Sequence, residues 1–171
     1  MTLREETFRL EAAIRVLHRK VFGRDDESNL IDALRKDGFI TVSLVAEEMG
    51  QVVGHVLFSN IRIETQDGTM LAAALAPIAV LAEWRNQGIA STLIQEGMEM
   101  CRKRGKLAAL VLGDPRFYSK FGFSARLARN LRSPYSNAGA AWMAAELKPG
   151  ALKDTFGLVR YTHPFERLGA E

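Results

Sequence analysis

The amino-acid sequence predicts an α/β or α+β domain, with a mixed central sheet of about six to seven strands flanked by helices. Apolar residues recur at helical spacing near the N-terminus and again after Gly88, whereas several segments between them have the composition of strands. The strand expected after Gly50 is apolar on both faces, which is typical of a strand covered on both sides. Helices and strands mixed in this order therefore indicate a sheet between layers of helices.

The expected helices follow from apolar residues at a spacing of three and four, and from residues that begin or end helices. Ser28 is a suitable N-cap for the second helix, and Gly38 is a suitable stop. The helices are expected at 6–21, at 29–36, from Ile89 to a point before Gly105, and, as a short helix, at 116–121.

The expected strands are apolar runs bounded by glycine, proline or polar turns. They cover 41–48, 51–63, 70–80, 107–112, 140–147 and 157–162. Pro77 interrupts the third of them. Because proline cannot donate to a sheet ladder, we expect a bulge or a parting of neighbouring strands there.

Composition limits the classes of protein to which the chain can belong. Its 171 residues are close to half apolar, which is enough for one domain with a sizeable core. Cys101 is the only cysteine, so an internal disulfide framework is excluded and a reducing, cytoplasmic location is expected. The net charge of +3 is mild and spread along the chain, which predicts no nucleic-acid partner. The absence of a long apolar run predicts no membrane partner.

The stretch RNQGIA, residues 85–90, lies between a strand and a helix and has two interpretations. Glycine is a poor helix former, yet Gly88 stands where a long helix begins. A helix start offers unpaired N–H groups and the positive end of the helix dipole, and glycine lets an anion approach the backbone. The stretch is therefore either an ordinary turn or a socket for phosphate. It matches neither the dinucleotide fingerprint nor the Walker loop.

A second motif, Tyr118 ahead of Gly122 and Phe123, follows further along the chain. Together, Arg85-x-x-Gly88-x-Ala90 and this motif resemble the GNAT superfamily of acyl-CoA-dependent N-acyltransferases. The first is similar to the family's Arg/Gln-x-x-Gly-x-Gly/Ala motif, with alanine where many members have glycine. The tyrosine stands at the usual site of the family's acid.

The resemblance is densest from about 42 to 123, and residues 76–80 match the family's fourth strand. The segments GHVLFS, GDPRFYSKFGF and ELKPGAL resemble a bacterial subgroup whose substrates are mostly unassigned. The implied architecture is a GNAT-type fold with splayed fourth and fifth strands. It implies a single N-acetyltransferase domain over 1–171, with its core motif region at 42–123 and its acceptor-side and C-terminal strands at 124–171.

The resemblance also implies acetyl-CoA as co-substrate and no metal. Backbone groups near Pro77 would hold the pantetheine arm like an extra strand, and the N–H groups that open the third helix would bind the pyrophosphate. Arg85, Arg116 or Lys120 would meet the 3′-phosphate. The implied cofactor-binding residues are Ile78, Ala79, Val80, Arg85, Asn86, Gln87, Gly88, Ile89, Ala90 and Ser91.

For catalysis, the resemblance implies that Tyr118 protonates the leaving thiolate and that the Val80 N–H stabilises the oxyanion. An amine that is mostly protonated at neutral pH must also lose a proton. His55 is the expected base, although a lone histidine within a strand is more often a core residue. Glu83, Asp114 or a chain of water molecules are the alternatives. Cys101 has no evident histidine partner, so a covalent acyl-enzyme is not expected.

The function that follows is transfer of an acetyl group from acetyl-CoA to a primary amine by direct attack. The acceptor is a small metabolite, an antibiotic, a peptide N-terminus or a lysine side chain, and a homodimer is left open. The stretch GRDDES, residues 23–28, and the segment 126–141 are the expected walls of the acceptor site, and the acids of the first would favour a cationic acceptor. The alternatives are a non-catalytic acyl-CoA-binding or sensing module of the same fold and an unrelated nucleotide-binding domain.

Overall fold

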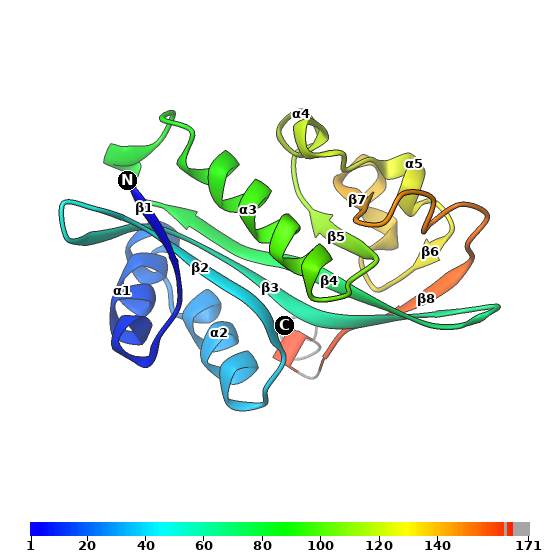
Figure 1. Cartoon of the computed structure of the whole chain (residues 1–171), viewed down its shortest axis with the longest axis horizontal. Coiled ribbons are helices and arrows are strands. Elements are labelled where there is room, and N and C mark those ends of the chain that lie inside the picture. The colour runs from blue at the N-terminus through cyan, green and yellow to red at the C-terminus, as the bar shows by residue number, and fades with distance from the viewer. Residues whose placement is uncertain (163, 166–171) are drawn as a thin grey trace. The chain divides into compact units, whose positions relative to one another are not determined.

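The described part of the chain, residues 1–162 and 164–165 of the computed structural model, forms one mixed sheet of eight strands (Figure 1). Six strands follow the order β1-β2-β3-β4-β5-β7, and β8 pairs with both β3 and β6. The strands are β1 (Thr2–Glu5), β2 (Ile40–Glu48), β3 (Gln51–Thr65), β4 (Gly68–Val80), β5 (Ala108–Leu112), β6 (Leu131–Arg132), β7 (Trp142–Glu146) and β8 (Gly157–Arg160).

The sheet exceeds the predicted six to seven strands because two short strands have no sequence pattern of their own. Strand β1 has four residues, none fully buried, and β6 has only two. Neither is long enough to show the alternation of apolar and polar residues that identifies a strand. The other six strands lie where the sequence predicts them, and β4 continues through Pro77 with a cis Ala76–Pro77 bond.

The helices agree with the predicted pattern except near their ends and after residue 124. They are α1 (Glu11–Phe22), α2 (Asp26–Lys36), α3 (Ile89–Lys103), α4 (Pro115–Tyr118) and α5 (Ala125–Ala128), with 3-10 turns η1 (Phe8–Leu10), η2 (Ala82–Trp84), η3 (Ser119–Phe121) and η4 (Ser136–Ala141). Helix α5 has no predicted counterpart, and it is a single turn capped by the Ser124 side chain. No helix of the described residues is long and apolar enough to cross a membrane.

The chain divides into two compact units, each containing parts of β3 and β4. The first unit comprises Met1–Ser59 and Ala76–Gly97. Within it, β1, β2 and the first part of β3 pair in antiparallel register, for example Leu3 with Ala46 and Val45 with His55.

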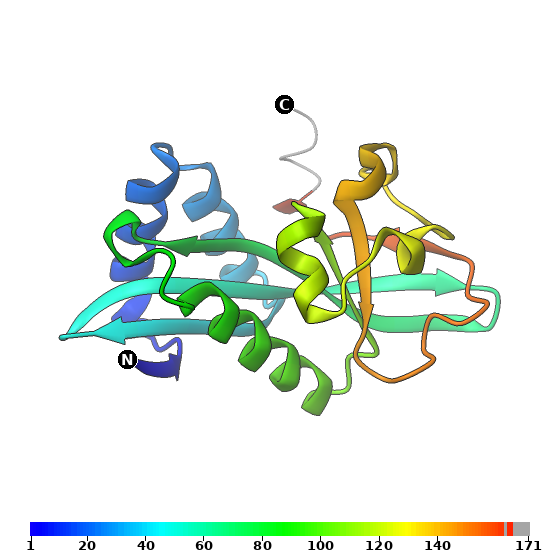
Figure 2. The same ribbon diagram turned by 90° about the horizontal axis from the view of Figure 1, so that it is seen from above.

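Helices pack on both faces of β3 within the first unit, as the apolar pattern predicts (Figure 2). On one face, Gly54 faces α3 so closely that a Cβ atom there would lie 2.9 Å from Cγ2 of Ile89. On the other face, the ring of His55 contacts His18 of α1. Because successive residues of a strand point to opposite faces, the two contacts confirm that β3 is covered on both sides.

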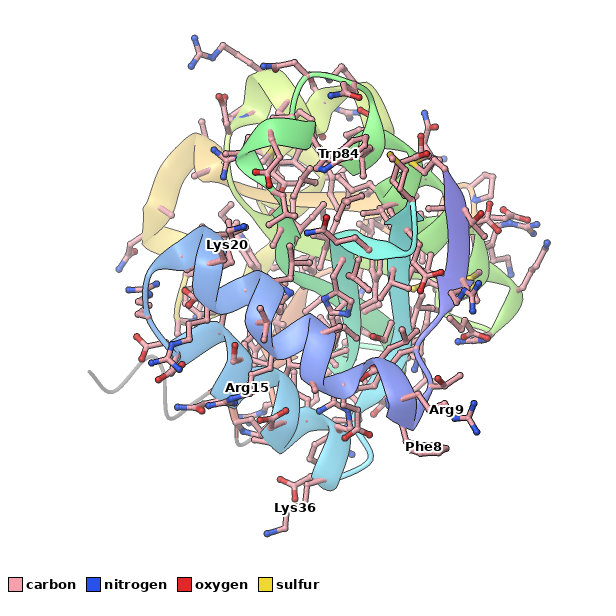
Figure 3. The ribbon with its side chains drawn as sticks, turned by 90° about the vertical axis from the view of Figure 1, so that its left-hand side faces the viewer. Phe8, Arg9, Arg15, Lys20, Lys36 and Trp84 are labelled. Atoms are coloured by element: carbon pink, nitrogen blue, oxygen red, sulfur yellow. The ribbon has the colours of Figure 1, made fainter. Side chains whose placement is uncertain are left out.

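Helix α2 begins three residues before its predicted start, so the expected N-cap is wrong. Ser28 lies buried inside the helix, and its hydroxyl donates to the Arg15 carbonyl at 3.1 Å. The first turn carries Asp26 and Glu27, whose negative charges favour a helix N-terminus. The side chain of Arg15 joins α1 to α2 by donating to Asp32 at 2.7 Å (Figure 3).

The second unit comprises Asn60–Leu75 and Met98–Glu171. In it, β4 pairs in parallel with β5 over Ala72–Ala74, and β5 pairs antiparallel with β7. The end of β3 pairs antiparallel with β8, which is parallel to β6. The splaying of β4 and β5 near Pro77 stays a prediction.

The contact between α3 and β3 yields a prediction about Gly97. A Cβ atom there would overlap the Phe58 ring. Although alanine favours a helix by about 1 kcal/mol, overpacking a core costs about 1–3 kcal/mol. We therefore expect Gly97→Ala to lower the free energy of unfolding, measured in urea. Phe58→Leu should relieve the clash. The double variant should therefore lose less free energy of unfolding than the sum of the losses in the two single variants. A Gly97→Ala chain as stable as the parent would contradict this packing.

Candidate active site

The loop between β4 and α3 leaves a row of backbone donors open. Within the first unit, the N–H groups of residues 86 to 91 donate to no backbone carbonyl, and the first helical bond runs from Thr92 N to Gly88 O at 3.0 Å. Gly88 has a φ of 81° and open space where a Cβ would stand. Asn86 also has a left-handed φ, 60°. The conformation therefore requires glycine at position 88 and presents N–H groups at the positive end of a 15-residue helix.

Side chains hold this loop without occupying its N–H groups. The Arg85 guanidinium donates from Nε to the Val80 carbonyl at 3.2 Å, and Gln87 donates from Nε2 to the Glu83 carbonyl at 3.4 Å. Both bonds end on backbone carbonyl oxygens, so they hold the loop and leave its N–H groups open. The free donors, the missing Cβ and the helix dipole fit a pyrophosphate, which is the group that the family resemblance implies for this loop.

The start of α3 is fixed by packing in the first unit. Ile89 and Leu93 are buried, and both face Gly54 of β3, with Leu93 Cδ1 3.1 Å from the position of a Cβ atom there. Because the helix rests on a glycine, its first turn lies close to the strand. The open N–H groups are therefore held on a rigid element rather than on a free loop.

Tyr118 lies in the second unit, at the end of the short helix α4. The Asp114 side chain caps this helix by accepting from Arg116 N at 2.9 Å. The ring of Tyr118 contacts Phe117 and Phe123 edge to face, at centroid distances of 5.0 and 5.9 Å. A Cβ atom at Gly113 would overlap this ring, so the glycine leaves the space that the tyrosine occupies.

The Tyr118 hydroxyl is suited to give a proton rather than to take one. The side chain is 9 % exposed, and this burial raises the pKa of its phenol. A phenol whose pKa is raised stays protonated at neutral pH, which a general acid requires.

His55, the base expected from the sequence, lies fully buried in a row of three side chains of the first unit. Its Nδ1 lies 2.8 Å from Nε2 of His18, and its Nε2 lies 2.8 Å from the Ser43 hydroxyl. The His18 ring stacks on Phe22, and its Nδ1 has no hydrogen-bond partner among the described residues. Both nitrogens of His55 are therefore already engaged with protein groups.

Proton counting in this row favours a structural role for His55. If His55 donates from Nδ1 to His18, it accepts from Ser43; if it accepts from His18, it donates to Ser43. Either arrangement satisfies both nitrogens of the neutral ring, which matches the core-histidine alternative. Burial lowers the pKa of both rings, that of His18 to about 4, so both are neutral at pH 7.

His18 is a buried partner that was not expected from the sequence, although the sequence contains a signal for it. It follows Ile14 by four residues and therefore lies on the apolar stripe of α1. A polar residue on such a stripe needs a buried partner. That partner is set by the contact between α1 and β3, which the spacing within α1 does not specify.

Glu83, Asp114 and Cys101 have the surroundings of a surface carboxylate, a helix-capping carboxylate and a buried thiol, respectively. Glu83 is exposed and lies 3.8 Å from the Lys20 ammonium. Asp114 bonds its own turn, as expected, and the hydrogen bond from Arg116 lowers the pKa of its carboxyl. Burial raises the pKa of the Cys101 thiol to about 12, so it is not a nucleophile at neutral pH.

The acidic stretch at 23–28 is not an open loop. Asp25 lies 3.5 Å from the Arg19 guanidinium, and Glu27 accepts from the Arg24 side chain. The second half of the stretch, from Asp26, forms the first turn of α2. Its charges are thus largely balanced by neighbouring arginines, which weakens the expected preference for a cationic acceptor.

A glycine at the helix start after β4 and a tyrosine after β5 are the features in which the chain resembles acyl-CoA-dependent acyltransferases. The chain belongs to the GNAT family, since residues 5–126 match the family model "Acetyltransferase (GNAT) domain". The chain is accordingly an acyltransferase. Within the described residues, no cluster of three or more metal-ligating side chains occurs.

Individual relatives agree with this family. The chain is 37% identical to the uncharacterised N-acetyltransferase YhbS of Escherichia coli, over 91% of this chain and 92% of the relative. The crystal structure of YhbS in complex with CoA superposes with a TM-score of 0.88, covering 97% of this chain and 92% of that one. A GNAT family acetyltransferase from Brucella melitensis in complex with acetyl-CoA is 30% identical, with a TM-score of 0.78 over 96% of this chain and 97% of that one.

The buried histidines predict a loss of stability in acid. The folded-state pKa of His18 is about 4, below the ordinary 6.5, so the unfolded chain binds more protons between these values. The free energy of unfolding should therefore fall as pH drops, with His18 alone contributing about 2 kcal/mol between pH 7 and 5. Glu27 opposes this effect by favouring charged His18, and Arg35 reinforces it at His55. Urea unfolding at several pH values measures it.

The variant His55→Gln separates the structural role from the catalytic one. A structural His55 predicts early melting at pH 7 and a shallower pH dependence of stability. It also predicts that the turnover rate, measured with an acceptor that the protein acetylates, falls toward acid pH as it does in the parent. A variant that melts like the parent but loses this fall in rate would instead identify His55 as the base.

Proposed function

We propose that this chain transfers an acetyl group from acetyl-CoA to a primary amine, which attacks the thioester directly. The observation that carries the proposal is the start of α3, where N–H groups without backbone acceptors surround Gly88 on a helix anchored to β3. The CoA and acetyl-CoA complexes of the similar structures support the choice of co-substrate.

When bound, acetyl-CoA supplies the activated acyl group. The chain's own residues have three tasks around it. Residues 86 to 91 hold the pyrophosphate through backbone N–H groups, and Ile78, Ala79 and Val80 hold the pantetheine arm. The N–H of Val80 donates to the oxygen that gains charge during attack, and such a donor typically contributes about 2.7–4 kcal/mol.

The Tyr118 hydroxyl then protonates the leaving thiolate. Burial among Phe117, Phe123 and Gly113 supports this role, because it keeps the phenol protonated and the ring in one place. For the amine proton, both nitrogens of His55 are occupied, so we rank ordered water or Glu83 ahead of it as the acceptor. Cys101 takes no part, and the amine attacks without an acyl-enzyme.

A direct test of the function is release of free CoA thiol from acetyl-CoA with a panel of small amines, peptides and lysine-containing proteins. Mass analysis of the products then identifies the acetylated acceptor. Thiol release that depends on one amine class supports the proposal. Tight acetyl-CoA binding without turnover on any amine would favour the binding-module alternative.

For the cradle, we expect Gly88→Glu to abolish CoA binding. The substitution places bulk and negative charge among the N–H groups that should receive phosphate, on a backbone with a φ of 81°. The parent should be stabilised by about 2.7 kcal/mol at a CoA concentration a hundred times the dissociation constant. Thermal melts with and without CoA measure the shift.

Gly105→Glu is the matched control for this substitution. Gly105 has a φ of 84° and open space at the Cβ position, but it follows the opposite end of α3. The control should therefore suffer the same backbone strain and keep the CoA-induced shift. Equal loss in both variants, or a parent that responds to ATP and not to CoA, would overturn the cradle assignment.

For the acid, we expect Tyr118→Phe to lower kcat by about 10²–10⁴-fold and to leave CoA binding intact. The change removes only the hydroxyl and keeps the ring between Phe117 and Phe123. Tyr135→Phe is the control, since Tyr135 is a partly buried tyrosine that packs on Trp142 and Tyr161. If Tyr118→Phe retains turnover within a few-fold of the parent, the ring serves packing alone.

A further inference from the structure

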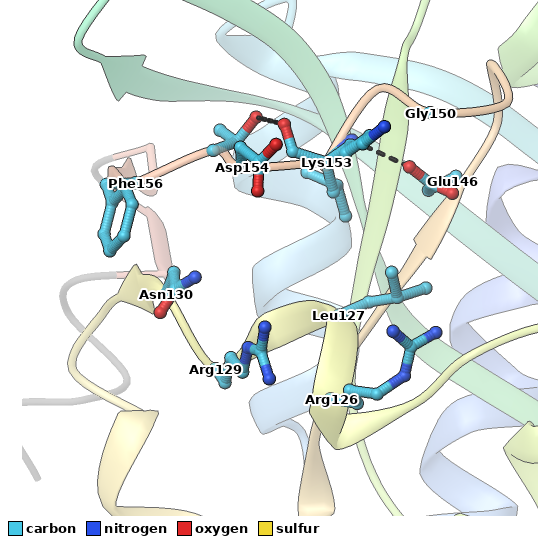
Figure 4. A pocket seen from close by; sticks show the side chains of 11 residues that line it. Arg126, Leu127, Arg129, Asn130, Glu146, Gly150, Lys153, Asp154 and Phe156 are labelled. Atoms are coloured by element: carbon cyan, nitrogen blue, oxygen red, sulfur yellow. Dashed lines mark hydrogen bonds between the residues drawn. The ribbon is translucent and has the colours of Figure 1, made fainter.

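The second unit contains a cavity of about 480 Å³ that the acetyl-transfer proposal does not use. One wall is α5 with the residues after it, and the other is the segment 150–156 that connects β7 to β8 (Figure 4). We propose that this cavity binds a small organic oxyanion, a carboxylate or a phosphate ester, that carries a flat apolar group.

The cavity lies away from the end of β5 that leads to Tyr118. Strand β7 runs antiparallel to β5, with Trp142 opposite Leu112 and Glu146 opposite Ala108. Tyr118 follows the Leu112 end, whereas the cavity includes Glu146 at the other end. At about 3.3 Å per residue, these two ends of β5 lie about 13 Å apart.

Among the described residues, the positive charges in the cavity have no partner. Arg126, Arg129 and Lys153 line it, and no ion pair or side-chain hydrogen bond of the described residues involves their charged groups. Other arginines of this unit, namely Arg102, Arg116 and Arg160, do have carboxylate partners, for example Glu99 beside Arg102 and Glu64 beside Arg160. Two guanidinium groups on one wall match the paired oxygens of a carboxylate or phosphate.

The negative groups of the cavity indicate where the anion sits. Glu146 is engaged, because its Oε2 accepts from Leu152 N at 2.8 Å. The Asp154 side chain lies on the wall formed by 150–156 and would repel an anion there. The oxyanion is therefore best placed against Arg126 and Arg129.

Apolar groups in the same cavity account for the rest of the ligand. Phe156 is 62% exposed, which is unusual for an aromatic side chain, and Leu127 lies on the α5 side. An aromatic or other flat group would cover the Phe156 ring and remove it from water.

Both walls are held in place before any ligand binds. Gln66 donates from Nε2 to the Asp154 carbonyl at 2.9 Å and accepts from Phe156 N at 3.2 Å. The Gly157 N–H donates to the Asn130 carbonyl at 3.1 Å, which ties one wall to the other. Binding therefore needs little ordering of the backbone.

The test uses the full-length protein saturated with CoA, titrated with phenyl phosphate, benzoate and the neutral analogue benzyl alcohol, and followed by NMR of the backbone amides. We expect phenyl phosphate or benzoate to shift amides of 126–130 and 150–156, and benzyl alcohol to shift none. Binding of the phosphate ester alone or of the carboxylate alone identifies the oxyanion, and either supports the proposal. Arg126→Gln with Arg129→Gln should weaken binding by about tenfold or more.

Arg132→Gln is the matched control, because Arg132 is an exposed arginine of β6 that does not line the cavity. It should bind the probe within about twofold of the parent. The proposal is overturned if neither anion shifts these amides, if Arg132→Gln weakens binding as much as the double variant, or if benzyl alcohol binds equally well. An anion that shifts these amides only in CoA-free protein would also overturn it, since the site would then be the CoA cradle. These outcomes do not depend on whether acetyl transfer occurs.

Discussion

The close contact between α3 and β3 is the constraint on which the proposed CoA site depends. Gly54 and Gly97 remove two side chains from this interface, so Ile89, Leu93 and Phe58 fill the space instead. Such packing has little freedom, because protein interiors are dense and tolerate small changes in volume poorly. The position of the first turn of α3 follows from it. The packing of the core in the first unit therefore orients the open N–H groups near Gly88.

The opposite face of β3 is held by polar contacts. There, Ser43, His55 and His18 form a buried row in which the two inner hydrogen bonds satisfy both nitrogens of the central ring. A polar row of this kind stabilises one arrangement of helix and strand, because any other would leave buried nitrogens without partners. The row also makes the first unit sensitive to protonation. His55 therefore connects stability to pH whether or not it takes part in catalysis.

In the second unit, the two ends of β5 offer different chemistry. Near Leu112, Tyr118 packs among aromatic rings, and this burial raises the pKa of its hydroxyl and keeps it protonated. Near Ala108, the cavity beside Glu146 is lined by an exposed Phe156 and by cationic side chains that pair with no described residue. A single scaffold can hold two such sites because antiparallel β7 leads from one end of β5 to the other.

The six longer strands, the approximate helices, the glycine at the start of α3 and the family could all be predicted from the sequence alone. Each of these is a local pattern, namely periodicity, a glycine at a helix start, or motifs in a fixed order. Three features are seen only in the tertiary structure. His55 contacts His18, Ser28 is buried in α2, and Arg126 and Arg129 line the same cavity as Phe156. These depend on contacts between residues distant in sequence, whose partners are set by how helices and strands pack and not by the spacing within any one of them.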